Sequence, residues 1–172
     1  MADAAGSQEQ QIIDGLHRWQ DRFLAGKVRF TQLFRRPPFH DGERFAVQIP
    51  HVGYAPPGGG MTAHSRLTGA SEGSAWATSD RLFVADASKV KHEWSWSDVS
   101  RVQVLPQWNG VIFDVGADLP AMLRNEATLT SGPVNPLALA AAWLKVEAAY
   151  AASQGQLEQW MDRLPARLGG AG

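Results

Sequence analysis

The hydrophobic positions near the N-terminus repeat with the period of a helix. The apolar side chains are three or four residues apart and form one stripe: Ile12, Leu16, Trp19 and Phe23. This spacing predicts an amphipathic helix over residues 8–25 that ends at Gly26, preceded by a frayed tail of small and polar residues. The double proline Pro37–Pro38 closes this region at residue 38, because proline neither continues a helix nor donates to a strand ladder.

The middle of the chain changes to short alternating runs, which are typical of strands. Phe45, Val47 and Ile49 alternate with polar residues and predict a first strand that reaches about Pro50. A long loop rich in Gly, Pro, Ser and Thr follows over residues 53–73, with a short strand near residues 61–67. Further strands are predicted at residues 73–78, 81–85, 91–96, 101–105, 110–115 and within 121–129. An Asn109–Gly110 turn and strands at such regular spacing indicate an antiparallel meander that curls into a barrel or sandwich.

The C-terminal part returns to the helical period. Pro136 at the first helical position and Asn135 as N-cap predict the start of a long helix, which packs on the sheet and kinks or ends near Gly155. A second stripe is predicted to stop at Pro165, before a disordered glycine-rich end; its members are Leu157, Trp160, Met161 and Leu164. We therefore divide the chain into residues 1–38, a main domain at 39–153 and a helical extension at 154–172.

Composition mainly excludes classes of protein. A chain of 172 residues suits one well-buried core. The absence of cysteine excludes disulfides, a thiol nucleophile and cysteine-containing zinc sites, and the net charge of −1 argues against a generally basic nucleic-acid binder. Because the chain shows neither a secretory leader nor an apolar run of membrane-spanning length, we expect it in the cytoplasm, with membrane association as the alternative.

Candidate catalytic and metal-binding patterns are weak. The five histidines lack the spacing of paired metal ligands: His17, His40, His51, His64 and His92. No Gly-x-Ser-x-Gly nucleophile turn occurs, and the glycine run in "PPGGGMTAHS" is not followed by the Gly-Lys-Ser/Thr of a phosphate loop. We expect no catalytic residue, no cofactor and no metal, and thus a protein that is not an enzyme.

The segment "GSAWATSDRLFVAD...HEWSWSDVSRVQV" resembles the strands of bacterial PH-like and GRAM-like domains, which belong to the pleckstrin-homology-like superfold. The matching positions are Gly73, Trp76, Thr78, Arg81, Leu82, Phe83, Trp96, Val99 and Val102. The lead-in Asp41-Gly42-Glu43 is also similar, so the resemblance covers residues 41–153. It implies an α+β fold: an antiparallel barrel or sandwich of about seven strands capped by a long C-terminal helix, with the N-terminal amphipathic helix as an addition.

The quoted turn also has a purely structural interpretation. Thr78, Ser79 and Asp80 can each bond nearby backbone groups and so close a tight turn, and Arg81 can reach back to Asp80 or to a loop carbonyl. Functionally, the resemblance implies lipid-headgroup binding, peptide or protein docking, or scaffolding. Members that bind phosphoinositides carry Lys and Arg in the first strand and the following loop, whereas here that loop supplies only His64 and Arg66.

Exposed apolar residues suggest the first functional hypothesis. Trp94 and Trp96 share one face of a predicted strand and are expected in the core, while Trp108 is either core or an interface anchor. The second C-terminal stripe can pair with the N-terminal helix, with a second subunit or with another protein. We therefore expect a PH-like module that mediates protein–protein assembly, as a homo-oligomer or with a protein partner, through Trp108, Leu157, Trp160, Met161 and Leu164.

Local charge supports the alternative. Residues 18–36 hold six basic residues against the single acid Asp21. The basic residues are Arg18, Arg22, Lys27, Arg29, Arg35 and Arg36. A basic amphipathic segment predicts peripheral association with an anionic lipid surface, unless the N-terminal helix simply packs on the sheet or on the C-terminal helix.

Overall fold

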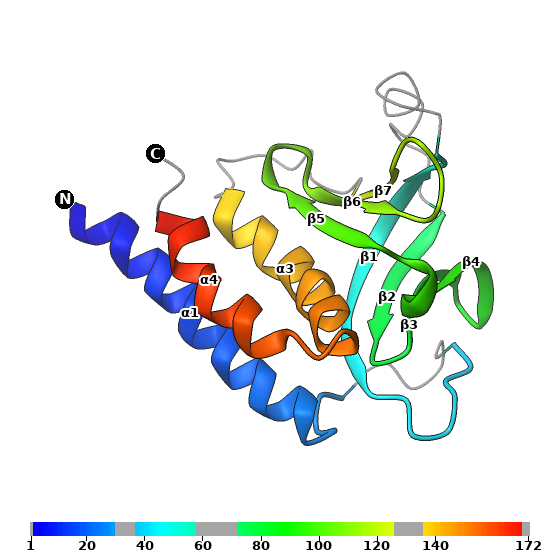
Figure 1. Cartoon of the computed structure of the whole chain (residues 1–172), viewed down its shortest axis with the longest axis horizontal. Coiled ribbons are helices and arrows are strands. Elements are labelled where there is room, and N and C mark those ends of the chain that lie inside the picture. Colours follow the sequence, from blue (N-terminus) through cyan, green and yellow to red (C-terminus); the bar gives the residue numbers. More distant parts are fainter. Residues whose placement is uncertain (1, 30–36, 58–71, 126–135, 170–172) are drawn as a thin grey trace.

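The computed structural model describes residues 2–29, 37–57, 72–125 and 136–169, which form a sheet covered on one side by helices (Figure 1). The helices are α1 (Ala2–Leu24), α3 (Pro136–Ser153) and α4 (Leu157–Gly169). The strands are β1 (Phe45–Ala55), β2 (Gly73–Thr78), β3 (Arg81–Asp86), β4 (Lys89–Ser95), β5 (Arg101–Leu105), β6 (Gly110–Asp114) and β7 (Ala121–Asn125). Two short 3₁₀ turns follow β4 and β5: η1 (Trp96–Asp98) and η2 (Pro106–Trp108).

One seven-stranded antiparallel sheet has the strand order β4-β3-β2-β1-β7-β6-β5. The long strand β1 pairs with β2 along its first half and with β7 along its second half. Its register shifts between Ile49 and Val52, where His51 has a φ of 55°. The predicted α+β class, the antiparallel pairing of the strands and the C-terminal helices are confirmed. Among the described residues β4 and β5 do not pair, so the sheet is open and the closed barrel remains a prediction.

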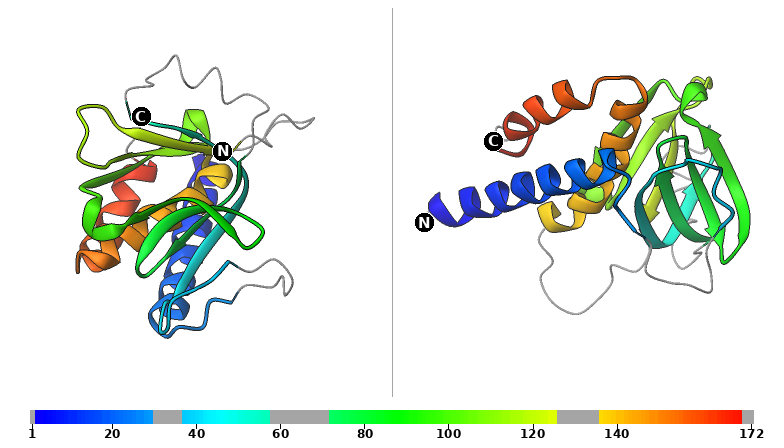
Figure 2. Two further views of the ribbon diagram at one scale, coloured as in Figure 1. Left: turned by 90° about the vertical axis from the view of Figure 1, so that its right-hand side faces the viewer. Right: turned by 90° about the horizontal axis from the view of Figure 1, so that it is seen from below.

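Helix α3 lies between the sheet and the other two helices (Figure 2). Alternate residues of the strands face it: Val111 and Phe113 belong to the main core, whereas Ile112 between them lies in a separate cluster on the opposite face. Trp96 is 2% exposed and donates from Nε1 to the Thr78 carbonyl at 2.8 Å, which confirms its core interpretation. Trp94 is half-buried and packs edge-on against Phe113, with ring centroids 4.7 Å apart.

Helix α1 is part of the same core. Leu16, Trp19 and Phe23 are almost fully buried against α3 and α4. The Trp19 indole also donates to the Ala46 carbonyl at 2.9 Å, at a register irregularity of β1, and so ties the helix to the sheet. Each such buried side chain stabilises the fold by about 1.5–3 kcal/mol. The sequence left open whether the N-terminal helix packs on the sheet, packs on the C-terminal helix or lies on a lipid surface. In the structure it packs on the C-terminal helices and on β1.

Helix α4 is fixed by the buried carboxylate of Glu147 in α3. Glu147 accepts hydrogen bonds from the Trp160 indole at 2.7 Å and from both terminal nitrogens of Arg167. It also accepts the backbone N–H of Val104 in β5 at 3.0 Å. One side chain of α3 therefore holds α4 on one side and the sheet on the other.

Several predicted boundaries are corrected. Helix α1 begins at Ala2, so residues 2–7 belong to the helix and not to a frayed tail. Strand β1 continues past Pro50 to Ala55, because the proline lies at the register shift, where no ladder bond is lost. Helix α4 continues through Pro165 to Gly169, since Arg167 beyond the proline is held by Glu147. Strand β4 ends at Ser95, and Trp96 opens η1. The predicted strand at residues 61–67, Asn135 and residues 170–172 lie outside the described residues.

A candidate anion-binding groove

The turn motif of the sequence lies on the face of the sheet opposite the helices, where Arg81 binds the lead-in segment. The Arg81 guanidinium donates to Glu43 from Nε at 2.9 Å and from Nη2 at 3.2 Å, and to Glu93 from Nη1 at 2.9 Å. It also donates to the Pro38 carbonyl at 2.7 Å and lies 4.2 Å from the ring centroid of Phe83. Arg81 therefore reaches a loop carbonyl, as expected, but its main partner is Glu43 and not Asp80.

This Arg81–Glu43 pair is structural. The two side chains are 5% and 0% exposed. Burial raises the pKa of the Glu43 carboxyl, but hydrogen bonds from Arg81, Thr78 and the His40 backbone outweigh burial and hold the pKa below its ordinary value. His40, Glu43 and Asp80 lie close enough together to suggest a cation site. Both Glu43 oxygens already accept bonds from Arg81, however, and the guanidinium charge opposes a second cation.

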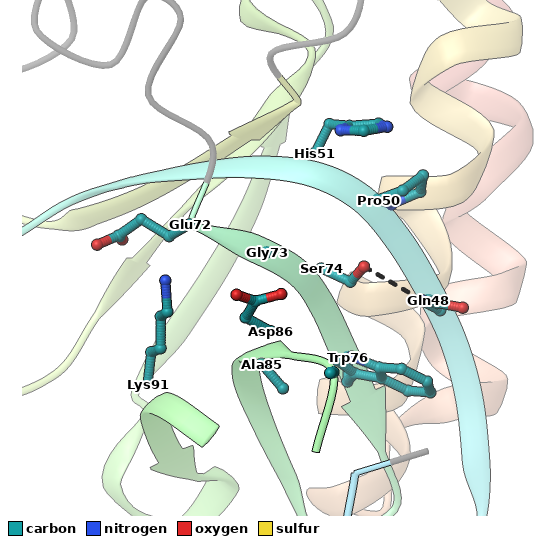
Figure 3. A pocket seen from close by; sticks show the side chains of 11 residues that line it. Gln48, Pro50, His51, Glu72, Gly73, Ser74, Trp76, Ala85, Asp86 and Lys91 are labelled. Atoms are coloured by element: carbon teal, nitrogen blue, oxygen red, sulfur yellow. Dashed lines mark hydrogen bonds between the residues drawn. The ribbon is translucent and has the colours of Figure 1, made fainter. Parts of the chain in front are cut away.

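A polar hollow of about 360 Å³ lies nearby on the same face of the sheet (Figure 3). Its lining carries charges of both signs. Lys91 extends between the carboxylates of Glu72 and Asp86, and Glu72 lies 3.1 Å from the His92 imidazole. A hydrogen bond of 3.1 Å from Gln48 to Ser74 links β1 and β2 at its floor. The hollow has room for a small polar molecule, but its mixed charges specify no class of ligand.

A second hollow, the cationic groove, lies between α1, β1 and α3 and encloses about 410 Å³. Arg18 and Arg22 line it from α1, Arg29 from the segment after α1, and Lys145 from α3. Its remaining lining residues are Gly15, Trp19, Val28, Phe45, Ala46, Val47 and Gln48. The helix end is positioned by Gly26, which has a φ of 70° and allows Lys27 to donate to the Arg22 carbonyl at 2.7 Å.

The cations of this groove have no acidic partner in the part of the chain that the structure describes. Within the described ranges, none of these four side chains forms a salt bridge. Burial, together with the neighbouring charge of Arg22, lowers the pKa of Lys145 below its ordinary value. Like charges that converge without an acid between them create a positive potential suited to an anion.

The lipid-binding residues predicted from the sequence are only partly brought together. Arg18, Arg22 and Arg29 line the cationic groove, whereas Lys27 is exposed beside the helix end and does not line it. Arg35 and Arg36 lie outside the described residues. The sequence interpretation missed Lys145, because a single lysine in an alanine-rich helix gives no charge signal until α1 is packed against it.

The predicted protein-interface residues have different positions. Leu157, Met161 and Leu164 are buried against α1 and α3, so the structure pairs this stripe with the N-terminal helix and leaves none of the three available to a partner. Trp160 is half-buried and donates to Glu147. Trp108 is half-buried on the face of the sheet away from the helices, where it packs on a small cluster with Leu105 and Ile112.

No helix in the described part of the chain is both long and apolar enough to cross a membrane. Comparisons with models of protein families, with curated proteins and with solved structures found no match to the chain.

Proposed function

We propose that the chain is a non-enzymatic binding module of PH-like architecture that holds an anionic group in the cationic groove. The observation that carries this proposal is the convergence of Arg18, Arg22, Arg29 and Lys145 without a carboxylate partner among the described residues. The cations come from three separate segments of the chain, so the groove exists only in the folded protein.

The strand order supports the PH-like part of the proposal. A long first strand is shared by two sets of strands, and a helix after the last strand covers the sheet. The motif residues Thr78 and Arg81 both bind Glu43 of the lead-in, which gives the two halves of the sequence resemblance a common structural role. In this proposal α1 is an addition that turns the covered face into a binding surface.

The chemistry of the groove favours a phosphate or carboxylate. Arginine guanidinium groups bind such anions through paired, charge-assisted hydrogen bonds, and a lysine adds a point charge. The half-buried Lys145 gains most, because an anion restores the favourable interactions that its ammonium lost on leaving water.

This proposal changes how the chain would meet a lipid surface. Leu16, Trp19 and Phe23 of α1 are used in the core, so these side chains are not available to insert into a membrane interface. Contact with anionic lipid would therefore use headgroups at the cationic groove and would weaken as salt screens the charges.

The test is titration with inorganic sulfate and phosphate, followed by amide chemical shifts at low and high salt. We expect shifts centred on Gly15, Arg18, Arg22 and Lys145, and we expect them to disappear in Arg18→Gln/Arg22→Gln. Lys27→Gln is the matched control, since it removes a charge from the same segment outside the groove. Equal losses in the control, or no shifts in the wild-type protein, would contradict the proposal.

A second candidate function is protein–protein assembly through the Trp108 cluster. The half-exposed residues Leu105, Trp108 and Ile112 form an apolar patch over the buried Met122, on the face of the sheet away from the helices. Light scattering of the purified protein tests it. Assembly that is lost in Trp108→Ser supports this function, and a monomer at every concentration counts against it. Removal of α4 is not a clean test, because it would uncover Leu16, Trp19 and Phe23.

A further inference from the structure

We infer that the ligand of the cationic groove is a single-chain anionic amphiphile, with its head beside Arg18, Arg22 and Lys145 and its chain along the α1–α3 contact toward Ile12. This inference rests on the proposed function, because it takes the cationic groove as the site of the anionic head. It adds the chemical class of the ligand and a second part of the site.

A second hollow continues the cationic groove along α1. It encloses about 390 Å³ and shares Gly15 and Lys145 with the groove. We call it the apolar arm, since Ile12, Leu16 and Ala141 line it, and Lys145 at the junction is the one charged residue among its described lining residues. Two glutamines, Gln8 and Gln11, complete its lining.

The two hollows follow one side of α1. Their lining residues on this helix recur with the period of the helix: Gln8, Gln11, Ile12, Gly15, Leu16, Arg18, Trp19 and Arg22. At a rise of about 1.5 Å per residue, this stripe is about 21 Å long. Its uncharged half begins at Gln8 and its charged half ends at Arg22, so the site changes from apolar to cationic along a single line.

Gly15 stands at the junction of the two hollows. A glycine inside a helix costs about 1 kcal/mol relative to alanine, so its position calls for a physical reason. Among the described residues, a Cβ built at Gly15 would come within 4 Å only of the Arg18 guanidinium, at 3.9 Å. Close packing therefore does not require a glycine here. The missing side chain instead leaves the passage between the cationic groove and the apolar arm open.

An amphiphile matches this distribution better than a bare anion does. An inorganic phosphate would satisfy the cations but leave the apolar arm in contact with water, whereas an alkyl chain covers the half-buried Ile12 and Ala141 with apolar surface. The apolar arm gives the cationic groove one apolar continuation, and a single alkyl chain suits it.

The first experiment is calorimetric titration of the full chain with ethyl, butyl, hexyl and octyl phosphate below their micelle concentrations, with inorganic phosphate as the chainless probe. Each methylene that enters the apolar arm should tighten binding about three- to fourfold, and the gain should stop once the arm is full. Phosphate binding with no dependence on chain length would overturn the amphiphile and leave the proposed function standing. No binding of any probe would overturn both.

The second experiment closes the junction. Gly15→Leu should lose most of the gain in affinity from ethyl to octyl phosphate, and this ratio does not depend on how the variant changes the binding of the phosphate head. His17→Leu is the matched control, because it places the same side chain at an exposed position of α1 outside both hollows. Thermal unfolding establishes that both variants fold. An undiminished chain-length gain in Gly15→Leu would contradict the inference.

A third measurement separates a monomeric amphiphile from a membrane surface. Flotation with phosphatidic acid vesicles reports on headgroups within a bilayer. If the wild-type protein floats with these vesicles but does not distinguish octyl from ethyl phosphate, the headgroup alone is the ligand and the inference is wrong. If octyl phosphate competes with the vesicles far better than ethyl phosphate does, the inference is supported.

Discussion

Two covered cations on opposite sides of the molecule have opposite surroundings. Arg81, on the face of the sheet away from the helices, is 4% exposed and donates to two carboxylates and a carbonyl. Lys145, on the helical side, is half-buried without a salt bridge among the described residues, and its nearest charge effect comes from Arg22. The charge of Arg81 is balanced by partners within the fold. The charge of Lys145 has no acidic partner among the described residues and is available to a bound anion.

The pKa values of Arg81 and Lys145 shift in opposite directions because of these surroundings. Burial lowers the pKa of Arg81, but hydrogen bonds and the charges of Glu43 and Glu93 raise it above its ordinary value. Burial lowers the pKa of Lys145 and a second cation lowers it further. A charge with partners serves stability, whereas a covered charge without one is a candidate for binding.

The largest expected effect is on the free energy of unfolding. Arg81→Met leaves the Glu43 carboxylate covered and uncompensated, so we expect a loss of about 3–5 kcal/mol. Lys145→Met removes a charge that has no partner, and its effect should stay within about 0.5 kcal/mol or be stabilising. Urea unfolding of both variants checks the comparison. A large loss in Lys145→Met would show that this lysine also has a structural role.

A second prediction concerns the carboxylate that holds α4. Glu147→Gln weakens the bonds to Arg167 and Trp160, and hydrogen bonds to charged groups contribute about 1.5–3 kcal/mol each. Hydrogen exchange in α4 should therefore accelerate more than exchange in β2 or β3. Glu158→Gln, an exposed change on the same helix, is the control and should leave exchange unaltered.

Acid should weaken the stabilisation that the Arg81–Glu43 pair provides. The pKa of Glu43 is lower in the folded chain than its ordinary value of 4.5, so the unfolded chain takes up protons first as the pH falls. The stabilisation is complete above the unfolded value and is lost as the pH falls through the folded value. Unfolding midpoints between pH 6 and pH 3 should fall less steeply in Glu43→Gln than in the wild-type protein. Equal slopes would contradict this assignment.

The smallest expected effect is a loss of anion affinity at alkaline pH. Because the pKa of Lys145 is lowered, its charge is lost earlier than that of an ordinary lysine as the pH rises. Affinity for sulfate, whose own charge is constant there, should fall about two- to fivefold as Lys145 deprotonates. Lys145→Arg stays charged and should remove the fall. A fall of equal size in that variant would assign the effect to another group.

Much of the fold follows from local pattern. Alternating apolar residues and the i, i+4 stripes locate the strands and helices, because the period of burial is a local property. The cationic groove was harder to predict from the sequence. Arg18, Arg22 and Arg29 stand out as an excess of charge, but Lys145 is more than a hundred residues away and joins them only when α1 packs on α3. The apolar stripe of α4 was predicted from the sequence. Whether it packs on a partner or on α1 depends on tertiary packing, which the local pattern does not contain.

The bond from the Val104 N–H to Glu147 has a consequence for how the protein avoids self-association. Val104 lies in β5, the last strand of the sheet, whose outer side has no strand neighbour among the described residues. Such a strand offers a template on which another chain can add as a further strand, the first step toward aggregates and fibres. Glu147 occupies one of these donors and α3 covers the strand. Detachment of the helices would therefore expose the unpaired edge of β5. The helical layer thus protects the chain against aggregation through this edge.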